Sequence, residues 1–168
     1  MGVRISEARV RDALPILALH RAVLDERDFF ITDPAEFTAS IEEKTRWILE
    51  VRDSVNSVVL CARAPTLVGF VSVLGGGLAR MRHAAKIEIM VSPEHRGVGV
   101  GRALMAAAIA WGEENSDIEK LGLSVFATNK RAIALYEAVG FEVEGRRRRE
   151  YRMEDGSYRD DLLMYRFV

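Results

Sequence analysis

The chain has 168 residues, 49% of them hydrophobic, and a formal net charge of −1. This length and composition predict one domain, residues 1–168, with a hydrophobic core of its own and no general attraction to nucleic acid. Cys61 is the one cysteine, which excludes an internal disulfide. The apolar run around it predicts a buried thiol rather than a nucleophile.

The N-terminal residues contain no apolar signal core, and no stretch of the sequence is long and apolar enough to cross a bilayer. The sequence also contains no internal repeat and no linker rich in Pro, Gly or Ser. We therefore expect a cytoplasmic protein with no membrane partner.

The first predicted elements are a strand and a helix. Residues 3–8 predict the strand, and Asp12 is expected to cap a helix that runs to Glu26. The buried face of this helix is predicted to hold Ile16, Leu19 and Val23.

A second helix and a hairpin are expected next. The helix is predicted to start at Asp33-Pro34, with the proline in its first turn, and to reach Val51. The β-rich runs at 58–63 and 67–74 are separated by a short turn, and they predict an antiparallel hairpin.

The second half of the chain gives clearer patterns. Its expected elements are a strand at 86–91, a loop at 92–98, a helix at 99–114, a strand at 121–126, a helix from Asn129 to Gly140, and a last hairpin that turns at Asp155-Gly156. The apolar face of the helix after Asn129 is predicted to consist of Ala132, Leu135, Tyr136 and Val139. This order requires at least one parallel strand pair, so the fold class is α/β with helices covering the sheet.

A glycine-rich loop connects the strand at 86–91 to the helix that follows. It reads Ser92-Pro93-Glu94-His95-Arg96-Gly97-Val98-Gly99-Val100-Gly101-Arg102. Glycines allow the backbone to approach a ligand closely, and the first N–H groups of a helix lack partners and carry partial positive charge. The loop therefore predicts a phosphate or pyrophosphate site, with a glycine-rich turn that binds nothing as the alternative.

Two nucleotide-binding motifs do not fit this loop. A P-loop requires Lys and then Ser or Thr where Arg102-Ala103 stand. A dinucleotide fingerprint requires a glycine at Arg102 or a small residue at Leu104, depending on where it starts.

The spacing of Arg96, Gly99 and Gly101 resembles the acetyl-CoA pyrophosphate loop of the GNAT acetyltransferase superfamily. A second match, similar to that family's next strand and helix, comprises Leu123-Ser124-Val125, Asn129, Ala132, Leu135-Tyr136 and Gly140-Phe141. The resemblance covers residues 84–145. It implies the GNAT fold, a mixed and mostly antiparallel sheet flanked by helices, with a parallel strand pair splayed to admit acetyl-CoA.

The resemblance also implies roles in binding acetyl-CoA. Backbone groups of Met90 and Val91 would pair with the pantetheine arm and polarise the thioester carbonyl. Asn129 would contact the pantetheine or shape the loop beside it. The segment that would wrap the pyrophosphate, chiefly through main-chain N–H groups, is Arg96, Gly97, Val98, Gly99, Val100, Gly101 and Arg102. The adenosine phosphates would meet Arg102, Lys130 and Arg131, unless these are solvated surface residues.

Two residues are candidates for catalysis. By the resemblance, Tyr136 would point its hydroxyl at the CoA sulfur; the alternative is a core aromatic bonded to a backbone carbonyl. Glu88 is the candidate general base because its strand ends at the cofactor loop. Alternation predicts Glu88 and Met90 on one face of that strand, and the alternative for Glu88 is a structural carboxylate paired within the sheet.

Other titratable residues are expected to contribute less. His20, His83 and His95 are weaker candidate bases by position, and no pair of them has metal-ligand spacing, so no metal is expected. The arginines at 146–149 predict either a carboxylate-binding site or solvated, paired side chains on a strand.

The function implied is N-acetylation of a primary amine by acetyl-CoA, with a small molecule such as an amino acid or polyamine as acceptor. A homodimer is compatible with the resemblance. Two alternatives stay open: acetylation of protein N-termini or lysines, and a non-catalytic acyl-CoA sensor, against which Tyr136 argues.

Overall fold

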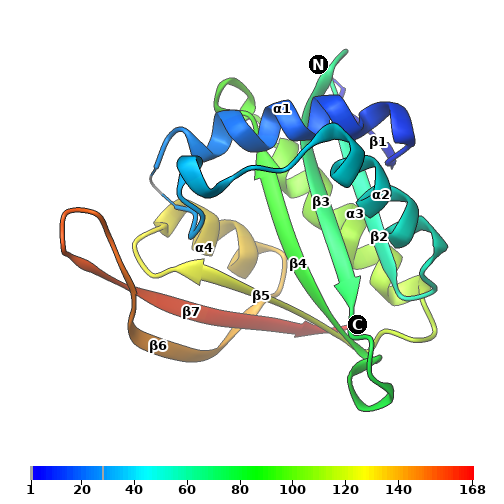
Figure 1. Cartoon of the computed structure of the whole chain (residues 1–168). Helices are drawn as coiled ribbons and strands as arrows, with labels where there is room; N and C mark the ends of the chain where they lie inside the picture. Colours follow the sequence, from blue (N-terminus) through cyan, green and yellow to red (C-terminus); the bar gives the residue numbers. More distant parts are fainter. Residues whose placement is uncertain (1, 28) are drawn as a thin grey trace.

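A computed structural model describes residues 2–27 and 29–168. Seven strands form one sheet in the order β1-β2-β3-β4-β5-β7-β6 (Figure 1). The strands are β1 (Arg4–Glu7), β2 (Ser57–Arg63), β3 (Leu67–Gly75), β4 (Ala84–Val91), β5 (Lys120–Phe126), β6 (Glu142–Arg152) and β7 (Tyr158–Phe167). All neighbouring pairs are antiparallel except β4 and β5, which run parallel.

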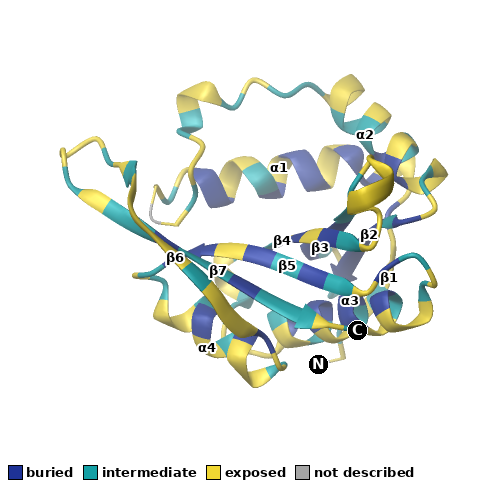
Figure 2. Cartoon of the chain, turned by 90° about the horizontal axis from the view of Figure 1, so that it is seen from below, coloured by how far each residue is buried: buried dark blue, intermediate teal, exposed yellow. Residues whose placement is uncertain are grey.

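Helices cover both faces of the sheet. Helices α1 (Ala13–Leu24) and α2 (Ile41–Asp53) pack on one face, and α3 (Val100–Glu114) and α4 (Lys130–Ala138) pack on the other. Each face has its own apolar core, and the strands between the helices are the most buried part of the molecule (Figure 2). Within the residues that the structure describes, no helix is long and apolar enough to cross a membrane.

The parallel pair β4–β5 is short, and this opens the sheet. Pairing is limited to Ala84–Lys86 with Lys120–Gly122, after which the two strands separate (Figure 1). The remaining residues of β4, up to Val91, therefore have no strand on that side. This confirms the expected mixed sheet with one splayed parallel pair.

Asp12 does not cap α1 as expected. The backbone angles of Asp12 are helical, and the Asp12 carboxylate accepts a hydrogen bond from the Arg9 N–H at 2.7 Å. The same carboxylate forms a largely buried ion pair with Arg63 on β2, at 2.7 Å. The Asp12 carboxylate therefore binds Arg63, which is distant in the sequence, instead of capping α1 as its local sequence predicts.

The helix expected from Asp33 to Val51 is interrupted. Asp33 caps only one 3₁₀ turn, Pro34–Glu36, and α2 begins later, at Ile41. Ser40 caps α2: its hydroxyl accepts from the Glu43 N–H, and the Glu43 carboxylate accepts from the Ser40 N–H. This reciprocal capping box satisfies two backbone donors and starts the helix there.

Cys61 is fully buried on β2, as predicted. Burial, followed by the negative charge of Asp12, raises the pKa of its thiol to about 12. The thiol is therefore neutral near pH 7 and contributes to packing, because only the thiolate is a good nucleophile.

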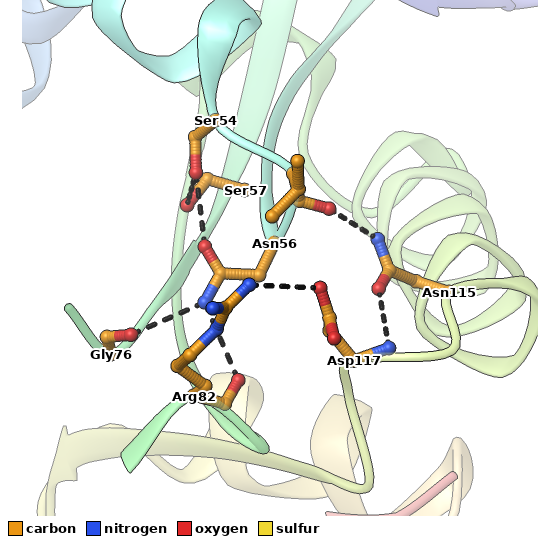
Figure 3. A network of polar contacts seen from close by, with 8 residues as sticks. Ser54, Asn56, Ser57, Gly76, Arg82, Asn115 and Asp117 are labelled. Carbon is orange, nitrogen blue, oxygen red and sulfur yellow. Dashed lines mark hydrogen bonds and ion pairs between the residues drawn. The ribbon is translucent and has the colours of Figure 1, made fainter. Parts of the chain in front are cut away.

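A polar network ties three chain connections together at the end of the sheet where β4 and β5 begin (Figure 3). The buried amide of Asn56 donates to the carbonyls of Gly76 and Arg82, at 3.2 and 3.4 Å, and accepts from the Ser54 hydroxyl at 2.9 Å. Nearby, Asn115 donates to the Val55 carbonyl. The network therefore joins the connections at the end of the sheet opposite to the one where β4 and β5 separate.

We expect Asn56→Ala to lower the free energy of unfolding by about 1–3 kcal/mol, because buried partners of the amide lose their hydrogen bonds. Its kcat should stay unchanged, since Asn56 does not line the cleft described below. Chemical denaturation and initial rates at a temperature well below the unfolding transition test both statements. A variant of unchanged stability would contradict this role of the network.

Candidate active site

A cleft of about 1040 Å³ runs through the sheet where β4 and β5 separate. Its walls come from both faces: Glu88 and Met90 belong to the face covered by α1, and Leu135 and Tyr136 belong to α4 on the other face. A ligand in this cleft can therefore be approached from both sides of the sheet.

The glycine-rich loop forms one end of the cleft, at the start of α3. Gly97 and Gly99 have φ angles of +77° and +94°, which favour glycine. The first helical hydrogen bond runs from the Ala103 N–H to the Gly99 carbonyl. In the described part of the chain, the N–H groups of residues 97–102 form no hydrogen bond with the backbone outside α3. Free N–H groups at a helix N-terminus form a cradle suited to an anion.

Side chains of this loop are engaged elsewhere or exposed. The Arg96 guanidinium donates to both oxygens of Glu26, at 2.9 and 2.5 Å, and to the Val91 carbonyl at 3.0 Å. The Val100 side chain is buried in the core, whereas Val98 is exposed. The loop can therefore bind an anion through its main chain, while Arg96 fixes the end of α1 to the end of β4.

The exposed edge of β4 presents particular backbone groups to the cleft. The Ala84 carbonyl accepts from the Gly76 N–H, and the Ser92 N–H donates to the Val68 carbonyl, so both residues hydrogen-bond on the β3 side. The β3–β4 register is regular between them. Alternation then directs the N–H and C=O of Met90 to β3, and those of Ile89 and Val91 to the cleft. Of the two residues predicted here, Val91 is placed at the open edge and Met90 is paired within the sheet.

Asn129 and the cationic residues lie around the rim of the cleft near the glycine-rich loop, where Arg131 approaches Gly97. The Asn129 side chain caps α4 by accepting from the Ala132 N–H at 3.1 Å. Arg102, Lys130 and Arg131 are exposed and line the cleft. Asn129 therefore shapes the start of α4, and the three cations give this rim a positive charge.

Tyr136 lies on the buried face of α4 and is 7% exposed. Its ring packs near that of Phe141, with the ring centroids 6.2 Å apart. Its hydroxyl forms no hydrogen bond to any residue in the described ranges, so the alternative of a core aromatic bonded to a backbone carbonyl does not apply. Burial raises the pKa of Tyr136 to about 12, which keeps the hydroxyl protonated near neutral pH.

Glu88 lies on the α1 face of β4, and its side chain opens into the cleft. Among the residues that the structure describes, it has no ion-pair partner within 4.0 Å. Desolvation within the cleft raises the pKa of the carboxyl, although Glu88 as a residue is exposed, and the positive charge of Lys44 on α2 opposes that rise. An unpaired carboxylate with a raised pKa is suited to accept a proton.

Two cleft residues were not predicted from the sequence, and His20 was considered only as a weaker candidate base. Ser72 on β3 lines the cleft beside Glu88, Asp161 on β7 lines it on the β5 side, and His20 on α1 borders it as well. Asp161 is 1% exposed, and burial raises the pKa of its carboxyl. Alternation along β3 and β7 indicates which face these residues occupy, but not that the face borders an opening.

The arginines at 146–149 are mostly engaged within the terminal hairpin. Arg146 forms an ion pair with Asp160 at 2.6 Å, and Arg149, with a φ of 52°, stacks on Tyr158 at 4.1 Å. An irregularity in the β6–β7 register lies here. Of the four arginines, Arg147 lines the cleft. The paired, solvated alternative therefore describes most of this run.

No group of three or more His, Cys, Asp or Glu side chains suited to a metal ion occurs within residues 2–27 and 29–168.

Comparisons with known proteins identify relatives of this chain. The model of the acetyltransferase (GNAT) family matches residues 21–141. The L-amino acid N-acetyltransferase of Escherichia coli is 30% identical over 68% of this chain and 70% of its own length. The spermidine N(1)-acetyltransferase of Vibrio cholerae is 31% identical over 59% of this chain and 56% of its own length.

Coverage of the curated relatives is partial: a Mycobacterium leprae protein is 36% identical over 61% of this chain, but over only 27% of its own length. Among solved structures, a GNAT-family acetyltransferase from Streptococcus pneumoniae superposes with a TM-score of 0.95 at 27% identity. That match covers 99% of this chain and 100% of the other.

Proposed function

Because the chain belongs to the GNAT acetyltransferase family, we propose that it transfers the acetyl group of acetyl-CoA to a primary amine of a small molecule. The observation that carries the proposal is the cleft through the splayed sheet, which joins an anion cradle, an open strand edge, a carboxylate and a phenol.

The cradle at the start of α3 suits the pyrophosphate of acetyl-CoA. A Salmonella typhimurium protein that shares the fold, with a TM-score of 0.87, is described as solved with its cofactor acetyl-CoA. In this chain, the N–H groups of residues 97–102 would bind the pyrophosphate oxygens, and Arg102, Lys130 and Arg131 would attract the adenosine phosphates. The backbone of Ile89 and the N–H of Val91 would pair with the pantetheine arm along the open edge of β4, since the Val91 carbonyl already accepts from Arg96.

Glu88 and Tyr136 supply complementary proton transfers from opposite faces of the sheet. The Glu88 carboxylate accepts a proton from the acceptor's ammonium, directly or through water, so that a neutral amine attacks the thioester carbonyl. The Tyr136 hydroxyl then donates a hydrogen bond or a proton to the leaving CoA sulfur. Because the cleft passes through the sheet, the two groups can act on one bound acetyl group without contacting each other.

The acceptor is a small amine such as an amino acid or a polyamine, in keeping with the names of two relatives. Thiol release from acetyl-CoA, measured with a panel of amino acids, polyamines, aminoglycosides and peptides, tests the proposal. Amine-dependent release is expected. Tight binding of acetyl-CoA without release on any amine would favour a sensor instead.

Gly99→Asp is expected to raise the Kd for acetyl-CoA at least tenfold over that of Gly99→Asn. A side chain at Gly99 enters open space, and both Asp and Asn tolerate a positive φ better than other non-glycine residues. The two variants therefore differ chiefly in a negative charge placed at the anion cradle. Calorimetric titration measures the two Kd values, and equal affinities would place the pyrophosphate elsewhere.

A further inference from the structure

Two residues that line the cleft each carry a polar atom with no hydrogen-bond partner among the described residues. These atoms are the Oγ of Ser72 and the Nδ1 of His20, and both atoms are buried. Ser72 is 1% exposed. Buried polar groups are nearly always hydrogen-bonded, because leaving one unpaired costs about 1–3 kcal/mol. A partner that this chain does not supply would satisfy both atoms.

Ser72 lies next to the candidate base, and His20 borders the same cleft. Ser72 on β3 is paired in register with Glu88 on β4, so their side chains occupy the same face on adjacent strands. Adjacent strands are about 4.8 Å apart. His20 projects from α1 above these strands, where its ring packs on Phe37 with centroids 4.3 Å apart. A small group that reaches Glu88 therefore lies beside Ser72, in the cleft that His20 also borders.

The charges around this corner of the cleft disfavour a second cation. Burial, followed by the positive charge of Lys44, lowers the pKa of His20 to about 4, so the imidazole is neutral near pH 7. Lys44 itself has no ion-pair partner within 4.0 Å in the described chain, and Lys86 lines the cleft nearby. Glu88 is the acidic group here, and its carboxylate interacts with the reacting amine. The neighbouring space therefore suits a neutral or anionic oxygen.

We propose that Ser72 and His20 donate hydrogen bonds to an oxygen on the carbon next to the reacting amine, so that the acceptor is an α-amino acyl compound rather than a polyamine. The inference rests on the proposed function and specifies its acceptor. Both free amino acids and peptide N-termini carry this group, as a carboxylate or a carbonyl. A polyamine offers only methylene groups at the same place and leaves both donors unpaired.

Initial rates of thiol release with matched acceptors test the inference. L-phenylalanine is compared with phenethylamine, which lacks only the carboxylate, with a phenylalanyl peptide amide, and with spermidine. We expect kcat/KM at least tenfold higher for an α-amino acyl acceptor than for its matched amine, and a lower value for spermidine. The same comparison is made for other amino acids and their decarboxylated amines.

These outcomes separate the inference from the function it rests on. A preference for the free amino acid over the peptide amide, or the reverse, identifies which source of the oxygen is used. Equal activity on matched amines, or a preference for spermidine, overturns the inference and leaves the proposed function intact. Absence of thiol release with every amine contradicts the proposed function, and the inference falls with it.

Variants of the two residues provide a readout that a packing role would not give. Ser72→Ala and His20→Leu should raise the KM for the amino acid about tenfold, with little change for the matched amine. Ser72→Thr and His20→Asn keep a polar atom in place and should restore much of the loss. The Tm of Ser72→Ala should equal or exceed that of the unmodified protein, because the removed hydroxyl has no partner. A lower Tm, or equal losses for both acceptors, would contradict the assignment.

Discussion

Tyr136→Phe is expected to lower kcat by a factor on the order of 10² to 10⁴, with little change in the affinity for acetyl-CoA. Negative charge develops on the CoA sulfur as the tetrahedral intermediate collapses. A free thiol has a pKa near ~8.5, so the departing thiolate gains from a proton or hydrogen bond. The Tyr136 hydroxyl is protonated, lines the cleft, and is not engaged by another described residue.

The measurement is kcat at saturating acetyl-CoA and acceptor, under conditions in which single-turnover kinetics show that chemistry limits the rate. Tyr165→Phe is the matched control, since Tyr165 makes a long hydrogen bond to Glu142 outside the cleft; its kcat should be unchanged. Calorimetry with acetyl-CoA separates a loss of binding from a loss of rate. A near-normal kcat for Tyr136→Phe would remove the hydroxyl from the mechanism.

Features coded by neighbouring residues were predicted well. The glycine loop and α3 follow from the spacing of Gly97, Gly99 and Gly101 before an apolar helical face, and the helix begins at Val100, one residue after the expected start at Gly99. Tyr136 was placed on the buried face of α4 by its helical spacing, although Ile133, which the pattern omitted, is buried there as well. Such patterns report which face is apolar, because burial follows the period of the helix.

One mistaken boundary could have been avoided with the sequence alone. Ser40 followed by Glu43 is a capping box, and it marks a helix start more strongly than Asp33-Pro34 does for a long helix. The Asp12 error was different in kind, because nothing near Asp12 in the sequence indicates that Arg63 will bind its carboxylate. The start of α2 could therefore be predicted from neighbouring residues, whereas the role of Asp12 depends on the tertiary fold.

The acceptor side of the cleft was the least predictable part. The cleft lies where β4 and β5 stop pairing, after only three residues of each strand, and no residue pattern in either strand marks that point. His20, Ser72 and Asp161 come from three separate elements, α1, β3 and β7. They were identified by the cleft that they line and, for His20 and Ser72, by a buried polar atom without a hydrogen-bond partner. The sequence shows residue types and their periodicity, but it does not show which buried polar atoms lack a hydrogen-bond partner in the folded protein.

Glu88→Gln is expected to lower kcat/KM near neutral pH by a factor on the order of 10² to 10⁴ if the amine has a high pKa. Freeing a lysine-like amine, of pKa near ~10.4, at pH 7 costs roughly 4–5 kcal/mol, whereas an α-amine near ~8 costs about 1–1.5 kcal/mol. The loss should therefore be smaller for an α-amino acceptor. Glu114→Gln, an exposed change at the end of α3, is the control and should retain full activity.

The pH profile of kcat/KM distinguishes a base from a carboxylate that only binds. A base must be deprotonated, so activity should fall as the pH drops through the pKa of Glu88. Burial raises that pKa, which places the acidic limb above the ordinary carboxyl range of about 4.3. The limb should be absent in Glu88→Gln. A Glu88→Gln protein with an unchanged profile would assign the proton transfer to another group.

Lys44→Met then moves the limb in a predictable direction. The positive charge of Lys44 opposes the rise in the pKa of Glu88, so its removal should raise that pKa further and shift the acidic limb to higher pH. Lys44→Arg keeps the charge and should leave the limb in place. In the background of Glu88→Gln, Lys44→Met should cause no shift, because the titrating group is gone. A shift to lower pH, or one that persists without Glu88, would show that Lys44 acts on a different base.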